Sequence, residues 1–216
     1  MVQRMLRLLL PLASAFFILP PAHGWSQDDE LPTSGTDGPI YSLSAFGYWV
    51  EGEDFFILPI ATADFGTLHL EARYNYEDFK TGSLFAGWNL AFGSTVEVNL
   101  TPIGGVAFGR TTGLIPGLEA EVLYDILGFS LEGEYIFDLE DSAANFLYVW
   151  SELYASPTEW LFGGLAVQRM MVVQEDAEVS RGLMVGGTWE NISATFYLFE
   201  PGSSESFSLL GIEWIP

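Results

Sequence analysis

The feature that most constrains this sequence is an alternation of apolar and polar residues, repeated in short segments from Ile40 to the end of the chain. In residues 68–76 (LHLEARYNY) every second position, beginning with Leu68, carries an apolar or aromatic side chain. The positions between them carry His69, Glu71, Arg73 and Asn75. Side chains alternate between the two faces of a β-strand, so each such segment predicts a strand with one apolar and one polar face.

Segments of this kind, separated by clusters of Gly, Pro, Asp, Asn and Ser, predict about twelve strands. Their ranges are 41–50, 54–63, 66–76, 82–92, 95–103, 116–125, 128–138, 145–155, 158–169, 180–190, 192–200 and 205–215. The links after every second strand are very short, whereas most of the others are longer, the first (51–53) being the exception and 104–115 the longest. This asymmetry is typical of a single closed up-and-down antiparallel transmembrane β-barrel, with short periplasmic turns and longer external loops.

The first 24 residues predict a signal peptide. A basic start precedes a mostly apolar run that two prolines end, and Ala22-His23-Gly24 provides a small-x-small cleavage site. The run is shorter than the ~20 apolar residues of a transmembrane helix, which favours cleavage over an uncleaved anchor. Residues 25–39 are polar and rich in Asp, Gly and Pro, which predicts a flexible periplasmic lead-in, and residues 40–216 form the barrel.

The charge and the hydropathy of the chain also favour a barrel in a membrane. Without residues 1–24 the chain has 5 basic and 29 acidic residues, a net charge of −24. Yet 49% of all residues are hydrophobic and the mean hydropathy is +0.26. Both properties coexist where lipid contacts one set of residues and water the other. The acidity excludes nucleic acid as a partner and favours cations, and the absence of cysteine excludes disulfides and thiolate metal sites.

From residue 41 to 216 the chain resembles bacterial outer-membrane β-barrel proteins of the porin-like kind. The resemblance rests on the repeated alternation, the asymmetry of the links and an aromatic-rich last strand, 206–214 (SFSLLGIEW). Proteins of this class usually end on an aromatic residue that the barrel-assembly machinery reads, whereas this chain ends Trp214-Ile215-Pro216. The resemblance implies localisation in the bacterial outer membrane, with its lipid and the assembly machinery as partners.

The alternation alone does not say which face of the barrel meets lipid, since a soluble lipocalin-like barrel would turn its apolar face inward. About eight strands enclose an interior that side chains can fill, and the diameter grows with strand number. Twelve strands around an apolar lumen would leave a void, so we expect the apolar face outside. Aromatic residues near strand ends would then form the interfacial girdles. They are Tyr41, Trp49, Tyr76, Tyr124, Tyr135, Tyr154, Trp160, Trp189 and Trp214.

With the apolar face outside, carboxylates line the lumen. The predicted lumenal acidic cluster is Glu97, Glu119, Glu121, Glu132, Glu134 and Glu152, and the other predicted lumenal polar residues are His69, Glu71, Arg73, Asn75 and Asn99. A tight turn at Ile126-Leu127 would pair Glu121 with Glu132 and Glu119 with Glu134. Two carboxylates ~6 Å apart repel by about 3 kcal/mol at an effective dielectric of ~20. Partial protonation, pairing with arginine or bound cations would relieve this repulsion.

These observations predict a small channel or passive transporter with an acidic lumen that attracts cations or admits small solutes. One alternative is a non-conducting structural or adhesive barrel that acts through acidic external loops at 77–78, 138–141 and 175–176. Another is a lumenal hydrolase that uses His69, but Leu68 and Leu70 flank it and the sequence identifies no nucleophile within its reach, so no catalytic residue is predicted. No cofactor is expected beyond a loosely bound divalent cation in the lumen, whose ligands the sequence does not identify.

Overall fold

The computed structural model describes residues 38–216, so the predicted signal peptide and most of the predicted lead-in lie outside the described residues. Within 38–216, the structure contains no helix with the length and apolar character needed to cross a membrane. Its one helical element is a 3-10 turn, η1 (Ser142–Ala144). All other regular elements are β-strands, in agreement with the predicted all-β class.

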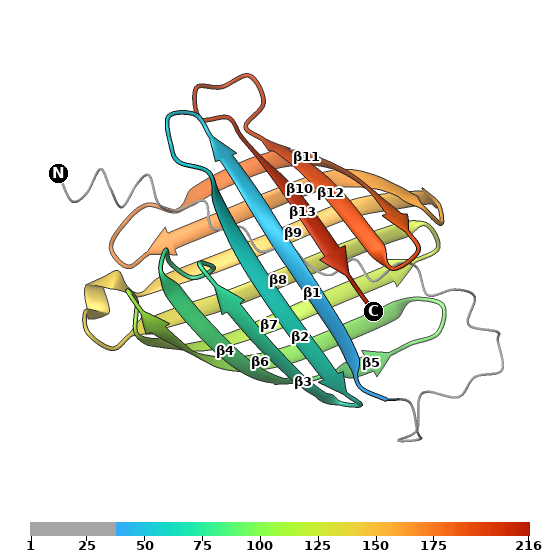
Figure 1. Cartoon of the computed structure of the whole chain (residues 1–216), viewed down its shortest axis with the longest axis horizontal. Helices are drawn as coiled ribbons and strands as arrows, with labels where there is room; N and C mark the ends of the chain where they lie inside the picture. The colour runs from blue at the N-terminus through green and yellow to red at the C-terminus, as the bar shows by residue number, and fades with distance from the viewer. Residues whose placement is uncertain (1–37) are drawn as a thin grey trace.

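The strands follow one another around a closed barrel (Figure 1). They are β1 (Ile40–Val50), β2 (Phe56–Phe65), β3 (Leu68–Tyr74), β4 (Thr81–Trp88), β5 (Leu90–Phe92), β6 (Glu97–Gly109), β7 (Gly113–Tyr124), β8 (Leu127–Asp138), β9 (Phe146–Thr158), β10 (Leu161–Val172), β11 (Glu178–Trp189), β12 (Ile192–Phe199) and β13 (Phe207–Trp214). All pairs are antiparallel, and the pairing of β1 with β13 completes the ring. β4 and β5 keep one register against β6, with Gly87 opposite Ile103 and Leu90 opposite Leu100. They are therefore one strand interrupted at Asn89, and the barrel has the predicted twelve spanning strands.

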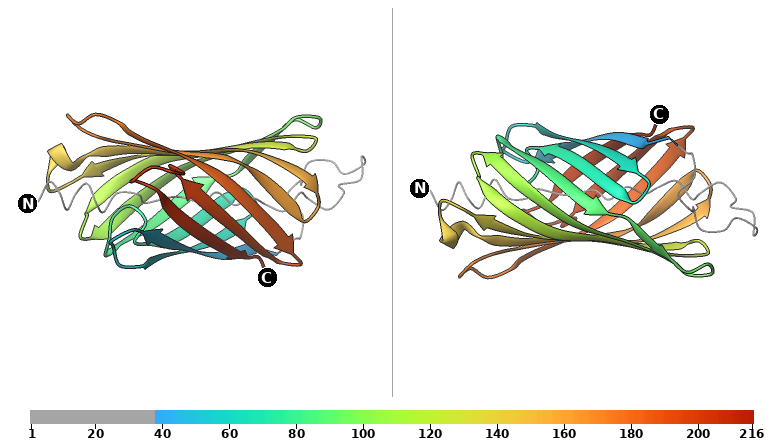
Figure 2. Two further views of the ribbon diagram at one scale, coloured as in Figure 1. Left: turned by 90° about the horizontal axis from the view of Figure 1, so that it is seen from above. Right: turned by 90° about the horizontal axis from the view of Figure 1, so that it is seen from below.

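The barrel has two distinct ends. Four links at one end have two residues each and the fifth, between β5 and β6, has four; the links at the other end have three to seven. β1 begins and β13 ends at the short-link end, where Leu43 pairs with Trp214. Seen from above and below, β1, β2, β12 and β13 form one wall and the middle strands of the chain form the other, with the strands of the two walls crossing (Figure 2). The alternation of short and longer links agrees with the sequence prediction.

The alternation in the sequence becomes a separation between the outside and the inside of the barrel. On β3, Leu68 and Leu70 are 39% and 38% exposed, whereas His69 and Glu71 between them are 6% and 5% exposed. Large apolar side chains are exposed in the same way on almost every strand. A soluble protein rarely exposes so much continuous apolar surface, so this surface suits a lipid environment.

The inside of the barrel also holds many aromatic rings, which the alternation alone did not predict. Several of them lie over a glycine directly opposite on the neighbouring strand. These pairs are Phe46–Gly211, Phe85–Gly105, Tyr154–Gly128, Phe162–Gly186 and Phe199–Gly182. A Cβ atom on these glycines would come within 2.1 to 2.9 Å of the ring that covers it. The glycines therefore make room for rings that lie flat against the inner wall.

The predicted long external loop at 104–115 is wrong. β6 continues to Gly109 and β7 begins at Gly113, so only residues 110–112 connect them. Despite its glycines, this segment keeps the strand pattern, because Val106, Phe108 and Leu114 point outward and are about half exposed. The glycine content suggested a loop, but here it serves ring packing on the inner face.

The predicted register between β7 and β8 is wrong by two residues. The turn is Asp125-Ile126, and Asp125 has a φ of 53°, a left-handed conformation that aspartate tolerates in tight hairpins. Tyr124 therefore pairs with Leu127 and Glu119 with Glu132, while Glu121 faces Ser130. A shift of two residues keeps every side chain on its predicted face but changes its neighbours.

Two of the predicted girdle residues, Tyr76 and Tyr154, are also wrongly placed: both are buried inside the barrel. β3 ends at Tyr74, and Asn75 has a φ of 61°, so the alternation does not continue to Tyr76. Tyr154 lies on the inner face of β9, because Glu152 and Trp150 also point inward there. Tyr41, Trp49, Tyr124, Trp160, Trp189 and Trp214 are exposed as expected.

Candidate functional site

A single arginine on β3, Arg73, joins carboxylates from two walls of the barrel interior. Its Nε and Nη2 atoms donate to the two oxygens of Glu71 at 2.7 and 2.8 Å. Its Nη1 atom donates to Glu132 at 3.0 Å and to Glu134 at 2.7 Å. Glu132 and Glu134 belong to β8, which is not a neighbour of β3 in the sheet. These hydrogen bonds therefore cross the interior rather than run along the wall.

Two further carboxylates lie close to the same guanidinium. Glu119 Oε1 is 3.6 Å from Nη2, and Glu77 Oε1 is 3.8 Å from Nη1. We call this group the Arg73 cluster; it consists of Arg73, Glu71, Glu77, Glu119, Glu132 and Glu134. With all groups ionised, five carboxylates surround one guanidinium and the formal charge is −4. A buried group with this imbalance attracts protons or cations.

Aromatic side chains hold Arg73 in place. Its Cζ atom lies 4.1 Å from the ring centroid of Tyr76 and 4.3 Å from that of Phe85, both within the range of cation–π attraction. The Tyr76 hydroxyl also donates to Glu132 Oε1 at 2.5 Å. Phe85 in turn lies over Gly105. The position of the guanidinium thus depends on ring packing as well as on charge.

The loop after β3 contributes to the cluster, which the sequence did not predict. Asn75, predicted to be lumenal, instead stays in this loop: its side chain accepts from the backbone of Lys80 at 2.8 Å and donates to the carbonyl of Ile57 at 3.1 Å. Glu77, predicted to belong to an external acidic loop, is buried and accepts from the Ser83 hydroxyl. Burial raises the pKa of the Glu77 carboxyl to about 7. The left-handed conformation at Asn75 explains both corrections, because it turns the following residues inward.

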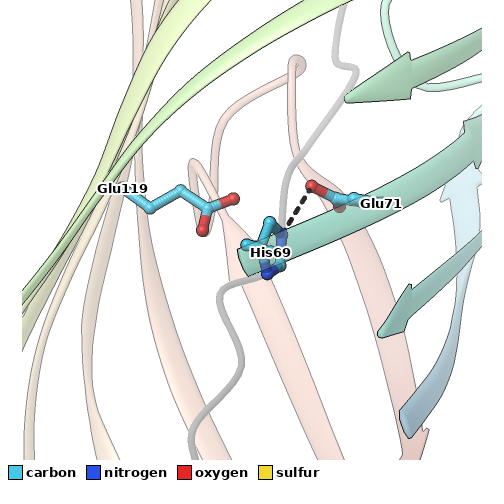
Figure 3. A group of neighbouring side chains, drawn as sticks. All are labelled: His69, Glu71 and Glu119. Atoms are coloured by element: carbon cyan, nitrogen blue, oxygen red, sulfur yellow. Dashed lines mark ion pairs between the residues drawn. The ribbon is translucent and has the colours of Figure 1, made fainter. Parts of the chain in front are cut away.

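His69 lies beside the cluster, toward the short-link end. Its Nδ1 atom is 2.8 Å from Asp64 Oδ1, which also accepts from the Asn89 side chain at 2.6 Å. Its Nε2 atom is 3.7 Å from Glu71 Oε2. Figure 3 shows Glu119 pointing toward these two residues from another strand, and one ligand atom from each of the three lies within 4.8 Å of the others. We call His69, Glu71 and Glu119 the His69 triad.

The remaining predicted acids do not contact Arg73 and are not part of the Arg73 cluster. Glu121 accepts from Asn99 at 3.3 Å and from the Tyr154 hydroxyl at 3.2 Å. Glu97, at the start of β6, is exposed. Glu152 accepts from the Trp150 indole at 2.8 Å and from the Tyr197 hydroxyl at 2.9 Å.

The Glu152 carboxylate is part of an aromatic group that we call the Glu152 network. It consists of Glu152, Trp150, Tyr197, Phe199 and Phe207. The ring centroids of Trp150 lie 5.5 Å from Tyr197 and 5.3 Å from Phe199. The predicted acids therefore divide into a charged group around Arg73, two carboxylates that accept from neutral donors (Glu121 and Glu152), and the exposed Glu97. The hydrogen-bond and ion-pair partners of His69 in the described residues are the carboxylates of Asp64 and Glu71.

Comparison with solved structures places this fold among porins. A KdgM porin in complex with disordered oligogalacturonate matches with a TM-score of 0.60 and 12% identity, over 80% of this chain and 98% of that one. A second KdgM porin structure matches with a TM-score of 0.59 and 11% identity, over the same shares of the two chains. No protein-family model matches the sequence, and a search of curated proteins finds no significant match. The likeness is one of fold, and it agrees with the expected closed, porin-like β-barrel.

Proposed function

We propose that this porin-like barrel is a small outer-membrane channel whose acidic interior favours cations and neutral solutes over anions. Export by the signal peptide at 1–24, insertion by the barrel-assembly machinery and contact with outer-membrane lipid are parts of the same proposal. The observation that carries it is the Arg73 cluster, in which one guanidinium faces five carboxylates. Channels select cations with acidic side chains placed where the solute passes.

The position of the cluster gives its charge an effect on a passing ion. Its members come from β3, β7, β8 and the loop after β3, so the charge reaches into the interior from several sides. Fields are stronger inside a low-dielectric wall than at an open surface, which raises the local concentration of cations. The full chain, with 7 basic and 29 acidic residues, adds a field of the same sign.

The charge of the Arg73 cluster also bears on the kind of solute found with the porin of similar fold. That porin was solved with oligogalacturonate, a sugar chain whose carboxylates make it a polyanion. The excess of carboxylates in the Arg73 cluster would repel such a solute. We therefore propose that this barrel, although similar in fold, does not accept polyanions of this kind.

The proposal can be tested in planar bilayers under a potassium chloride gradient. The expected reversal potential is that of a cation-preferring pore. Replacing Glu119 and Glu121 together (Glu119→Gln, Glu121→Gln) should move it toward zero, because two lumenal charges are removed. The control is Glu178→Gln with Glu205→Gln, which removes the same charge from exposed positions and should leave selectivity unchanged. An anion preference, or a selectivity that the lumenal pair does not alter, would overturn the proposal.

One observation favours a second function, a barrel that does not conduct. Side chains from non-neighbouring strands meet inside, as Arg73 does with Glu132 and Trp150 does with Tyr197. Such contacts narrow the interior, as expected of a structural or adhesive barrel acting through its external loops. The same bilayer experiment separates the two functions, since this barrel would show no single-channel steps.

A further inference from the structure

We propose that the His69 triad is a binding site for a divalent transition-metal cation such as Zn²⁺. This goes beyond the proposed channel, because a site of this kind holds its ion whether or not the barrel conducts. The proposal rests on three features of the triad: an imidazole nitrogen without a hydrogen bond, an oriented ring, and carboxylates in excess of the neighbouring positive charge.

The first feature is the Nε2 atom of His69. The side chain is 6% exposed, and within residues 38–216 this atom has no hydrogen-bond partner. A buried polar atom without a partner is costly, so it usually has a role that the bare chain does not show. Here the atom faces Glu71 Oε2, 3.7 Å away, and the carboxylate of Glu119 (Figure 3).

The spacing of these atoms suits a small cation. Tetrahedral ligands with bonds of ~2.0 to 2.2 Å lie about 3.3 to 3.6 Å apart. The separation between Nε2 and Glu71 Oε2 is close to this range, and the third ligand atom lies within 4.8 Å of both. Glu119 reaches the triad on a long side chain whose ion pair with Arg73 measures 3.6 Å, and metal binding requires a change of its rotamer to bring an oxygen to bonding distance.

The second feature is the hydrogen bond on the other side of the ring. His69 Nδ1 lies 2.8 Å from Asp64 Oδ1, and Asn89 donates to the same oxygen. A carboxylate that accepts from Nδ1–H fixes the ring and leaves the lone pair of Nε2 directed at the metal, the usual arrangement around metal-bound histidines. The Asp64 contact therefore prepares the Nε2 atom as a ligand.

The third feature is charge. Glu71 is held by Arg73 through both oxygens, but a carboxylate has about four lone-pair positions and each oxygen can accept a second partner. The positive charge of Arg73 is outnumbered by the carboxylates of its cluster, so a divalent cation reduces the local repulsion. An imidazole nitrogen with two carboxylates suits zinc, iron or nickel better than calcium or magnesium, which prefer oxygen alone.

The test is zinc binding by the metal-stripped full-length mature barrel in detergent, measured by isothermal titration and by the visible spectrum of bound Co²⁺. One equivalent of zinc should bind, with calcium and magnesium failing to compete at tenfold higher concentration. His69→Gln and Glu119→Gln should each weaken binding at least tenfold, and Asp64→Asn by 10- to 100-fold as for other residues that orient a ligand. Glu205→Gln, exposed and distant in the loop before β13, should bind zinc like the wild type.

The outcomes are separable from those of the channel experiment. Folding of each variant is checked by the heat-dependent shift of the barrel in gel electrophoresis, and Glu119→Gln serves if His69→Gln does not fold. Zinc bound equally by wild type and by the folded triad variants would show adventitious binding to an acidic surface and would overturn the site. An absence of stoichiometric binding would also overturn it, and would indicate an imidazolium ion-paired with Glu71 instead. Conductance is measured without zinc, so either proposal can fail alone.

Discussion

The barrel interior contains two groups of buried carboxylates that are stabilised in different ways. In the Arg73 cluster the acids share one guanidinium, and Arg73 makes two hydrogen bonds to Glu71 on its own strand and two to β8. In the Glu152 network the single acid accepts from the indole of Trp150 and the hydroxyl of Tyr197, and aromatic rings surround it. The two groups are adjacent, since Glu132 and Trp150 are paired across β8 and β9.

This difference indicates which of the two groups can accept an ion. One oxygen of Glu152, Oε1, accepts from two neutral donors, which bring no further charge, and close-packed rings leave a cation little room. A cluster in which acids outnumber the arginine keeps unneutralised charge, and its stability depends strongly on that one residue. We therefore expect the Arg73 cluster to respond to charge changes and the Glu152 network to respond mainly to lost hydrogen bonds.

The largest effect is expected from Arg73→Gln. Removing the guanidinium leaves buried carboxylates without their cation, which costs about 3–5 kcal/mol in the free energy of unfolding. Urea unfolding in lipid vesicles, followed by tryptophan fluorescence, measures it. Arg73→Lys keeps the charge but loses the paired hydrogen bonds, so its free energy of unfolding should lie between those of the wild type and Arg73→Gln. Arg181→Gln, at an exposed position, is the control. An equal loss in the free energy of unfolding for this variant would contradict the role assigned to Arg73.

A smaller effect is expected from Gly105→Ala, which tests the ring beneath the guanidinium. A Cβ atom at this position would lie 2.3 Å from the Phe85 ring, so the ring must move and Arg73 with it. Overpacking of this kind costs about 1–3 kcal/mol. Gly104→Ala is a matched control on the adjacent residue, because nothing lies within 4 Å of its Cβ position. Similar unfolding curves for the two variants would show that the ring is not confined by Gly105.

In the Glu152 network, Tyr197→Phe should cost about 1 kcal/mol, because Glu152 loses one donor and keeps the Trp150 indole. The same unfolding measurement detects the loss. Tyr124→Phe, on the exposed outer surface, should change the free energy of unfolding by less than ~0.5 kcal/mol. A loss as large as that of Arg73→Gln would contradict the distinction drawn between the two groups.

The last prediction concerns pH and Glu77. Its folded pKa is raised by burial to about 7 from 4.5, so the protonated form is the one that folding favours. This contribution to stability is complete below pH 4.5 and is lost as the pH rises to about 7. The stability of the wild type relative to Glu77→Gln should therefore fall over that interval, as measured by urea unfolding at a series of pH values. A rise instead would mean that Arg73 keeps Glu77 ionised.

Much of the fold can be predicted from the local alternation of apolar and polar residues. The site can be predicted from it only in part. The period-2 alternation identified the inward positions of Glu71, Arg73, Glu119, Glu132 and Glu134, because side-chain direction within a strand is a local property. It failed at Asn75, where a single left-handed residue ended the pattern and turned Tyr76 and Glu77 inward. The Asn75 side chain accepts a hydrogen bond from the backbone N–H of Lys80. The sequence alone gives little indication of such a contact across five residues.

A closed, twelve-stranded barrel with apolar residues outside and most of its strand carboxylates inside follows from the amino-acid sequence, because alternation and link length are local properties of the chain. Which of those carboxylates meet depends on the three-dimensional arrangement of the strands. Arg73 and Glu132 are 59 positions apart in the chain, and their contact depends on strand register and on how the walls cross. A shift of two residues preserves the pattern of faces and changes every partner, so no reading of the pattern alone fixes the site.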